Sequence, residues 1–74
     1  DITPTQNLRI THINKYGVDV LFCVNEGETK IKTVICESIE YILYPESGAV
    51  TAYDNDKYEL VLQSRKSLYL ILKQ

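Results

Sequence analysis

Apolar and polar residues alternate over short segments of this 74-residue chain, and the segments end at turn signals. Ile, Val, Thr, Tyr and Phe are frequent, and these residues suit the pleated, half-buried surface of a β-sheet. The turn signals recur at the spacing typical of an all-β domain. They are KYG at 15–17, EGET at 26–29, PESG at 45–48, DNDK at 54–57 and SRKS at 64–67.

This pattern predicts a mainly-β fold, with residues 1–74 forming a single small domain. We expect an antiparallel meander of about six or seven short strands, curled into a small barrel or roll of SH3-like size. The segment CESIEYIL is ambiguous, because its apolar residues also follow the spacing of an amphipathic helix. The β-rich flanks favour a strand there, and one short helical turn near residues 36–42 is the alternative.

Turn chemistry predicts which strands pair. Gly27-Glu28 suits a two-residue type II′ turn, which would place residues opposite one another when their numbers sum to 55. One apolar face then forms from Val20, Phe22 and Val24 opposite Ile35, Thr33 and Ile31. The same register holds Cys23 and Cys36 too far apart for a disulfide, so both are predicted to be free, packed thiols.

Two further turns follow in the second half of the chain. PESG has a proline pre-set for a turn and a glycine free to adopt positive φ, so strands 40–44 and 49–53 should pair. DNDK then turns the chain into a strand over residues 58–63. The last segment, SLYLIL, is apolar on both faces and needs a cover on each. We expect residues 68–72 to lie against residues 8–13 and close a barrel; a two-fold dimer through this strand is the alternative.

Composition limits the functional classes. The longest apolar run has five residues, far short of a membrane span, and the first residues show no secretory signal, so a cytoplasmic location is expected. DNDKYE begins like a calcium loop, but Glu59 and Arg65 occupy the positions where that loop needs glycine and a bidentate glutamate. His12 is expected to be a packed, hydrogen-bonded side chain. No metal, cofactor or catalytic motif is visible, so we do not expect an enzyme.

Charge is distributed unevenly along the chain. Residues 1–36 are neutral, residues 37–59 carry −5 and residues 60–74 carry +3, for a net charge of −2. The acidic middle also contains most of the tyrosines, which supply large, fairly rigid contact surfaces at interfaces. An ordinary solvated sheet surface is the alternative interpretation of this stretch. The candidate partner-binding residues are Tyr41, Tyr44, Glu46, Tyr53, Asp54, Asp56, Tyr58 and Glu59.

These residues predict a small soluble protein–protein interaction module, either an adaptor or an inhibitor. Its acidic, tyrosine-rich face would dock on a larger protein with a basic face, because opposite charges steer association. A second hypothesis is a nucleic-acid-binding small barrel, which is less favoured because acidic surfaces repel phosphates. A third is a structural subunit of a homo-oligomer, and the chain would be a monomer or a homodimer. The nucleic-acid hypothesis would use Arg65, Lys66, Lys73, Lys30 and Lys32.

Overall fold

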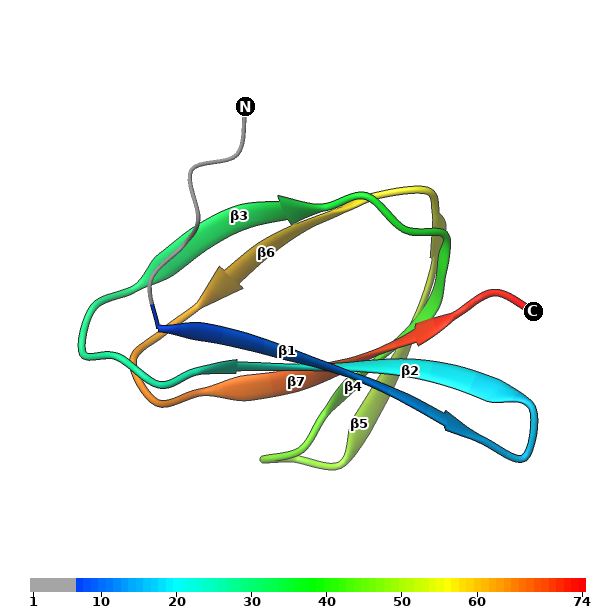
Figure 1. Cartoon of the computed structure of the whole chain (residues 1–74), viewed down its shortest axis with the longest axis horizontal. Coiled ribbons are helices and arrows are strands. Elements are labelled where there is room, and N and C mark those ends of the chain that lie inside the picture. Colours follow the sequence, from blue (N-terminus) through cyan, green and yellow to red (C-terminus); the bar gives the residue numbers. More distant parts are fainter. Residues whose placement is uncertain (1–6) are drawn as a thin grey trace.

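The computed structural model describes residues 7–74, which form seven antiparallel strands and no helix (Figure 1). The mainly-β prediction is therefore confirmed, and the strand predicted in the ambiguous CESIEYIL segment is present. The strands are β1 (Leu8–Lys15), β2 (Val18–Asn25), β3 (Ile31–Ile35), β4 (Ile39–Tyr44), β5 (Ala49–Asn55), β6 (Tyr58–Leu62) and β7 (Ser67–Leu72).

The strands form two sheets. Five of them make one sheet in the order β1-β2-β7-β4-β5, and β3 pairs with β6 in the other. In Figure 1, β3 and β6 lie across from β2 and β7. The chain passes between the two sheets where β3 leads into β4 and where β5 leads into β6. No closed barrel forms among residues 7–74, because β1 and β5 are the two outer strands of the larger sheet.

One long, bent hairpin links the two sheets. The numbers of two paired residues add to 93 all along the β3–β6 pair, beginning with Ile31 and Leu62. The same sum recurs along most of the β4–β5 pair. Residues 31–44 and 49–62 are therefore the two arms of a single hairpin, which leaves one sheet and enters the other near residues 36–38. A register irregularity next to Ile39 lies just beyond this bend, as expected where a strand changes direction.

The tips of the hairpins match the turn chemistry of the sequence. Between β4 and β5, the N–H of Gly48 donates to the carbonyl oxygen of Tyr44 at 2.8 Å, and Gly48 has a φ of 74°. The pairing predicted across PESG is confirmed. Between β1 and β2, Tyr16 and Gly17 both have positive φ, at 55° and 78°. Two such residues are the signature of the type I′ turns whose twist suits a two-residue hairpin.

The register predicted from Gly27-Glu28 is wrong. β2 pairs with β1 and β7, whereas β3 pairs with β6, so β2 and β3 lie in different sheets. Gly27 does not have the positive φ that a type II′ turn requires. It is buried instead, and a Cβ on it would lie 2.7 Å from the Asn7 side chain. Glycine serves here to allow close approach and not to close a hairpin.

A buried asparagine redirects the chain at this point. Asn25 is completely buried at the end of β2, and its Nδ2 donates to the carbonyl oxygens of Thr29, Leu62 and Gln63 at 2.8, 3.0 and 3.1 Å. Its Oδ1 accepts a hydrogen bond from the N–H of Gly27 at 2.9 Å. This one side chain therefore ties the end of β2 to the following loop and to the end of β6, in the opposite sheet.

The expected partner of the last strand is also wrong. β7 does not lie against residues 8–13; it is the central strand of the larger sheet, between β2 and β4. Its inward residues Leu68 and Leu70 are buried, whereas Tyr69 and Ile71 on the other face are only half-buried. Strand neighbours on both sides thus protect the backbone of β7, and one apolar face of it is left uncovered.

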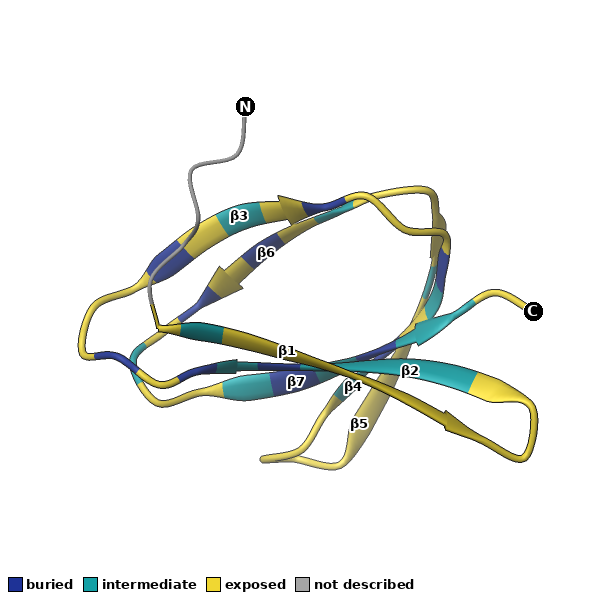
Figure 2. Ribbon diagram, viewed as in Figure 1, coloured by how far each residue is buried: buried dark blue, intermediate teal, exposed yellow. Residues whose placement is uncertain are grey.

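The core lies between the sheets. It includes residues from β2, β4, β6 and β7, and Figure 2 shows buried positions on both sheets while β1 and β5 are largely exposed. Both cysteines are free, as predicted, but only Cys23 is packed in this core, because Cys36 lies exposed just after β3. The core cluster comprises Cys23, Ile35, Ile39, Ile42, Leu60, Leu62, Leu68 and Leu70.

Replacing Asn25 should destabilise the fold strongly. Leucine has a similar volume but cannot bond to the three carbonyl oxygens or to the N–H of Gly27, so Asn25→Leu should lower the free energy of unfolding by about 3 kcal/mol. Urea denaturation followed by circular dichroism measures this. The exposed Asn55, replaced in the same way, is the matched control. Equal losses for Asn25→Leu and Asn55→Leu would contradict the role assigned to Asn25.

The two thiols should react at very different rates. Burial raises the pKa of the Cys23 thiol to about 11, so almost no reactive thiolate forms at neutral pH, whereas Cys36 is open to solvent. A disulfide reagent should therefore modify one thiol in the folded protein and two after denaturation. Cys36→Ser should remove the fast reaction only. Equal rates at the two thiols would show that Cys23 is not enclosed.

Candidate functional site: an apolar sheet face with an acidic corner

Strand register aligns the outward-facing residues of the larger sheet into rows. Side chains alternate between faces along a strand, so residues paired with Tyr69 or Ile71 share the face that points away from the core. Two rows cross all five strands, and nine of their ten members are apolar. We call them the apolar face: Ile13, Val20, Ile71, Tyr41 and Ala52 in one row, and Thr11, Phe22, Tyr69, Leu43 and Val50 in the other.

No segment of residues 7–74 covers this face. Tyr41 and Val50 expose 39% and 57% of their surface, whereas Ile42 and Leu70 on the inner face of the same sheet expose 3% and none. At its centre, the rings of Phe22 and Tyr69 lie 4.8 Å apart and tilted by 35°. Contiguous exposed apolar surface of this kind marks an interaction site more often than scattered apolar residues do.

The smaller sheet provides a contrast. Its outward residues include Val34 and Val61, which are as exposed as those of the apolar face, at 48% and 43%. Each of them, however, lies opposite a charged residue, because Val34 pairs with Glu59 and Val61 pairs with Lys32. The outer surface of β3 and β6 is therefore mixed and not continuously apolar.

An acidic corner adjoins the apolar face. A hollow of about 520 Å³ opens at one end of β4, β5 and β7, and its lining includes Glu40, Tyr41, Asp54 and Lys73. Lys73 Nζ lies 2.5 Å from Asp54 Oδ1, and this bond lowers the pKa of Asp54 and raises the pKa of Lys73. Asp56 and Glu40 also raise the pKa of Lys73. Three carboxylates thus surround one ammonium group, and the corner keeps a net negative charge.

The predicted tyrosines are divided between surfaces. Tyr41 belongs to the apolar face, but Tyr53 and Tyr58 pack against the core, with their rings edge to face at 5.1 Å. Burial, and next the neighbouring Tyr44, raise the pKa of Tyr58 to about 12. Tyr44 itself is about one-third exposed, at the end of β4.

The predicted acids are divided as well. Asp54 lines the corner, while Asp56 accepts a hydrogen bond from the hydroxyl of Ser38 at 3.0 Å. Glu46 lies in the turn at the hairpin tip and pairs with Lys66, and Glu59 is exposed on β6. Tyr41 is the one predicted candidate residue that belongs to the apolar face, and the other residues of the face are brought beside it only by pairing across strands.

The basic residues proposed for nucleic acid are largely neutralised by acids. Arg65 lies 3.7 Å from Glu28, and Lys66 and Lys73 pair with the carboxylates already described. Lys30 and Lys32 belong to the start of the smaller sheet, and neither has an ion pair within residues 7–74. Because Ile31 pairs with Leu62 and Arg65 contacts Glu28, the start of β3 and the turn after β6 lie at one end of the molecule. Lys30, Lys32, Arg65 and Lys66 belong to that end, where Glu28 and Glu46 offset part of their charge, whereas Lys73 lies at the acidic corner.

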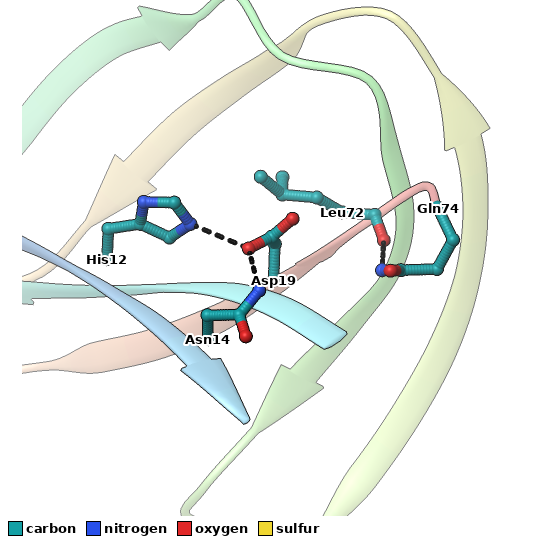
Figure 3. Close-up of polar contacts among 5 residues, drawn as sticks. All are labelled: His12, Asn14, Asp19, Leu72 and Gln74. Atoms are coloured by element: carbon teal, nitrogen blue, oxygen red, sulfur yellow. Dashed lines mark hydrogen bonds and ion pairs between the residues drawn. The ribbon is translucent and has the colours of Figure 1, made fainter. Parts of the chain in front are cut away.

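His12 belongs to a separate polar group on the inner side of the β1–β2 hairpin (Figure 3). Its Nε2 lies 3.1 Å from Asp19 Oδ1, which also accepts a hydrogen bond from Asn14 Nδ2 at 2.6 Å. The prediction of a hydrogen-bonded histidine is confirmed, but the prediction that it is packed is wrong, because 60% of its side chain is exposed. β1 lies at the sheet edge, beyond the cover of β3 and β6.

Removing Asn14 should change the titration of Asp19. Hydrogen bonds, first from Asn14 and then from His12, lower the pKa of Asp19, so its carboxylate adds stability above its ordinary pKa and loses that contribution as pH falls through the lowered value. Asn14→Ala should therefore shift the pKa of Asp19 upward, which carboxyl NMR titration measures. Asn55→Ala should not. An unchanged pKa in Asn14→Ala would contradict this bond.

Other kinds of site find little support. Within the described part of the chain, no group of three or more His, Cys, Asp or Glu side chains is arranged to hold a metal ion, and no helix is long and apolar enough to cross a membrane. Comparison of the chain with protein-family models, curated proteins and solved structures found no match. The apolar face and its acidic corner are therefore the candidate functional site.

Proposed function

We propose that this chain is a small protein–protein interaction module without enzymatic activity, which acts as an adaptor or an inhibitor. It docks on another protein through the apolar face, with the acidic corner at one end of the contact. The single observation that carries the proposal is the pair of apolar rows that cross five strands uncovered. Aromatic residues at its centre, Phe22, Tyr69 and Tyr41, match the composition of interface cores.

The acidic corner adds a requirement on the partner. A Lys or Arg side chain entering the hollow would approach the carboxylates of Glu40 and Asp54 and the ring of Tyr41. Carboxylates and an aromatic ring both attract a cation, so this end of the face selects a partner with a basic residue beside an apolar surface. The proposal thus keeps the predicted preference for a basic partner. It retains Tyr41 and Asp54 from the predicted residues and adds Glu40.

Nucleic acid is the second candidate, and the ion pairs argue against it. Arg65, Lys66 and Lys73 each face a carboxylate, so binding a phosphate would first require breaking an ion pair. A protein partner with an apolar surface and few charges can bind without breaking these ion pairs. The apolar face therefore supports a protein partner over a nucleic acid.

Substitutions on the apolar face should abolish partner capture. Val50→Glu places a charge among apolar residues, and Val61→Glu places the same charge at a similarly exposed position on the smaller sheet. Immobilised chain, incubated with extract of the organism that encodes it, should retain the same proteins in the wild type and Val61→Glu, and lose them in Val50→Glu. Quantitative mass spectrometry compares the three samples. Identical retention by all three would refute a docking role for this face.

A further inference from the structure

We infer that the protein covering the apolar face is a second copy of this chain, stacked face to face about a two-fold axis parallel to β7. This inference rests on the proposed interaction function and names the partner. Because β7 is the central strand of five, this rotation places every strand of the larger sheet over a strand of the copy. The axis runs along the central strand, so β7 lies over its own copy, β2 over the copy's β4, and β1 over the copy's β5.

Charge complementarity supports this arrangement. Lys15 lies two residues beyond Ile13 on β1, and Asp54 lies two residues beyond Ala52 on β5, at the same end of the apolar face. The rotation brings the Lys15 of each copy over the Asp54 of the other, at the acidic corner. Lys15 has no ion pair within residues 7–74, and its Nζ lies 6.0 Å from the centre of the exposed Tyr16 ring. It can exchange this solvent-exposed contact for the carboxylates of the hollow. The basic group that the corner requires is then supplied by the chain itself.

The opposite end of the face carries no free charge for such a match. Arg9 lies two residues before Thr11 on β1 but is paired with Glu26 at 3.2 Å, and Glu46 in the hairpin tip is paired with Lys66. The rotation places Arg9 over the tip of the copy. A two-fold axis perpendicular to the strands would instead place β1 over β1, with Lys15 facing Arg9 across the interface. That axis would also take Lys15 away from Asp54, so the charge match at the acidic corner selects the axis parallel to β7.

The apolar residues meet in compatible pairs. Under this rotation Ile13 faces Ala52 and Phe22 faces Leu43, while Tyr69 and Ile71 lie on the axis beside their own copies. Five strands spaced about 4.8 Å apart, over about 20 Å of length, cover roughly 480 Å² in plan. A pair of copies therefore covers about 1,000 Å², near the lower size limit of specific interfaces. The dimer should accordingly be reversible and depend on concentration.

Sedimentation equilibrium over a series of protein concentrations tests the inference. The wild type and Val61→Glu should approach twice the chain mass of 8.5 kDa, whereas Val50→Glu should weaken dimerisation by about a hundredfold or more, because it buries an unpaired charge against the copy. Circular dichroism verifies that each variant is folded. A wild type that stays monomeric would overturn the second-copy inference alone, because partner capture tests the proposed function separately.

A charge-reversal mixture tests the two-fold geometry. Lys15→Glu and Asp54→Lys each create like charges at both corner contacts, and each should weaken dimerisation about tenfold. Mixing the two variants restores one native and one reversed contact in every mixed pair. The mixture should therefore dimerise more strongly than either variant alone. Dimers that are insensitive to Val50→Glu, or a mixture no stronger than its components, would show that the copies meet elsewhere.

Discussion

The side chain of Asn25 is the constraint on which the rest of the structure depends. A completely buried amide must bond to other groups, and here its partners belong to the loop after β2 and to the end of β6. These bonds lie where β2 ends and the chain leaves the larger sheet for β3, which pairs with β6. They also hold the end of the bent hairpin against the larger sheet, so that Leu60 and Leu62 face the core. One polar residue thus joins the end of the larger sheet to the end of the smaller one.

The bent hairpin follows from this constraint and from the small size of the molecule. A chain of 74 residues cannot build two separate layers with long connections, because each ordered residue costs conformational entropy. One hairpin that crosses between the sheets supplies strands to both while keeping a single register. Only two strands are then left to cover a five-stranded sheet, and they cover its inner face alone. The outer face is apolar and has no cover within residues 7–74.

The apolar face and the acidic corner belong to one arrangement. Placing β7 at the centre aligns Tyr69 and Ile71 with apolar residues of four other strands. The same strand order places β1, with Lys15, at the opposite edge from β5 and Asp54. A surface with apolar rows at its centre and opposite charges at its two edges is suited to a rotated copy of itself. Association would cover β7 on the face that folding leaves open.

The sequence by itself determined the β class and the PESG hairpin, because each depends on composition or on residues close together in the chain. Both thiols are free as predicted, but the register from which that prediction was made is wrong. The sequence also shows that SLYLIL is apolar on both faces, and it predicted Tyr41 and Asp54 as candidate site residues. The tertiary structure alone decided that β2 pairs with β7, that Tyr53 and Tyr58 pack on the core, and that Val20, Phe22 and Val50 complete the site. The physical reason is that these features depend on strands far apart in the chain. The bonds of Asn25 to the carbonyl oxygens of Leu62 and Gln63 are contacts of the same kind, across 37 and 38 positions of sequence, and no local pattern records them.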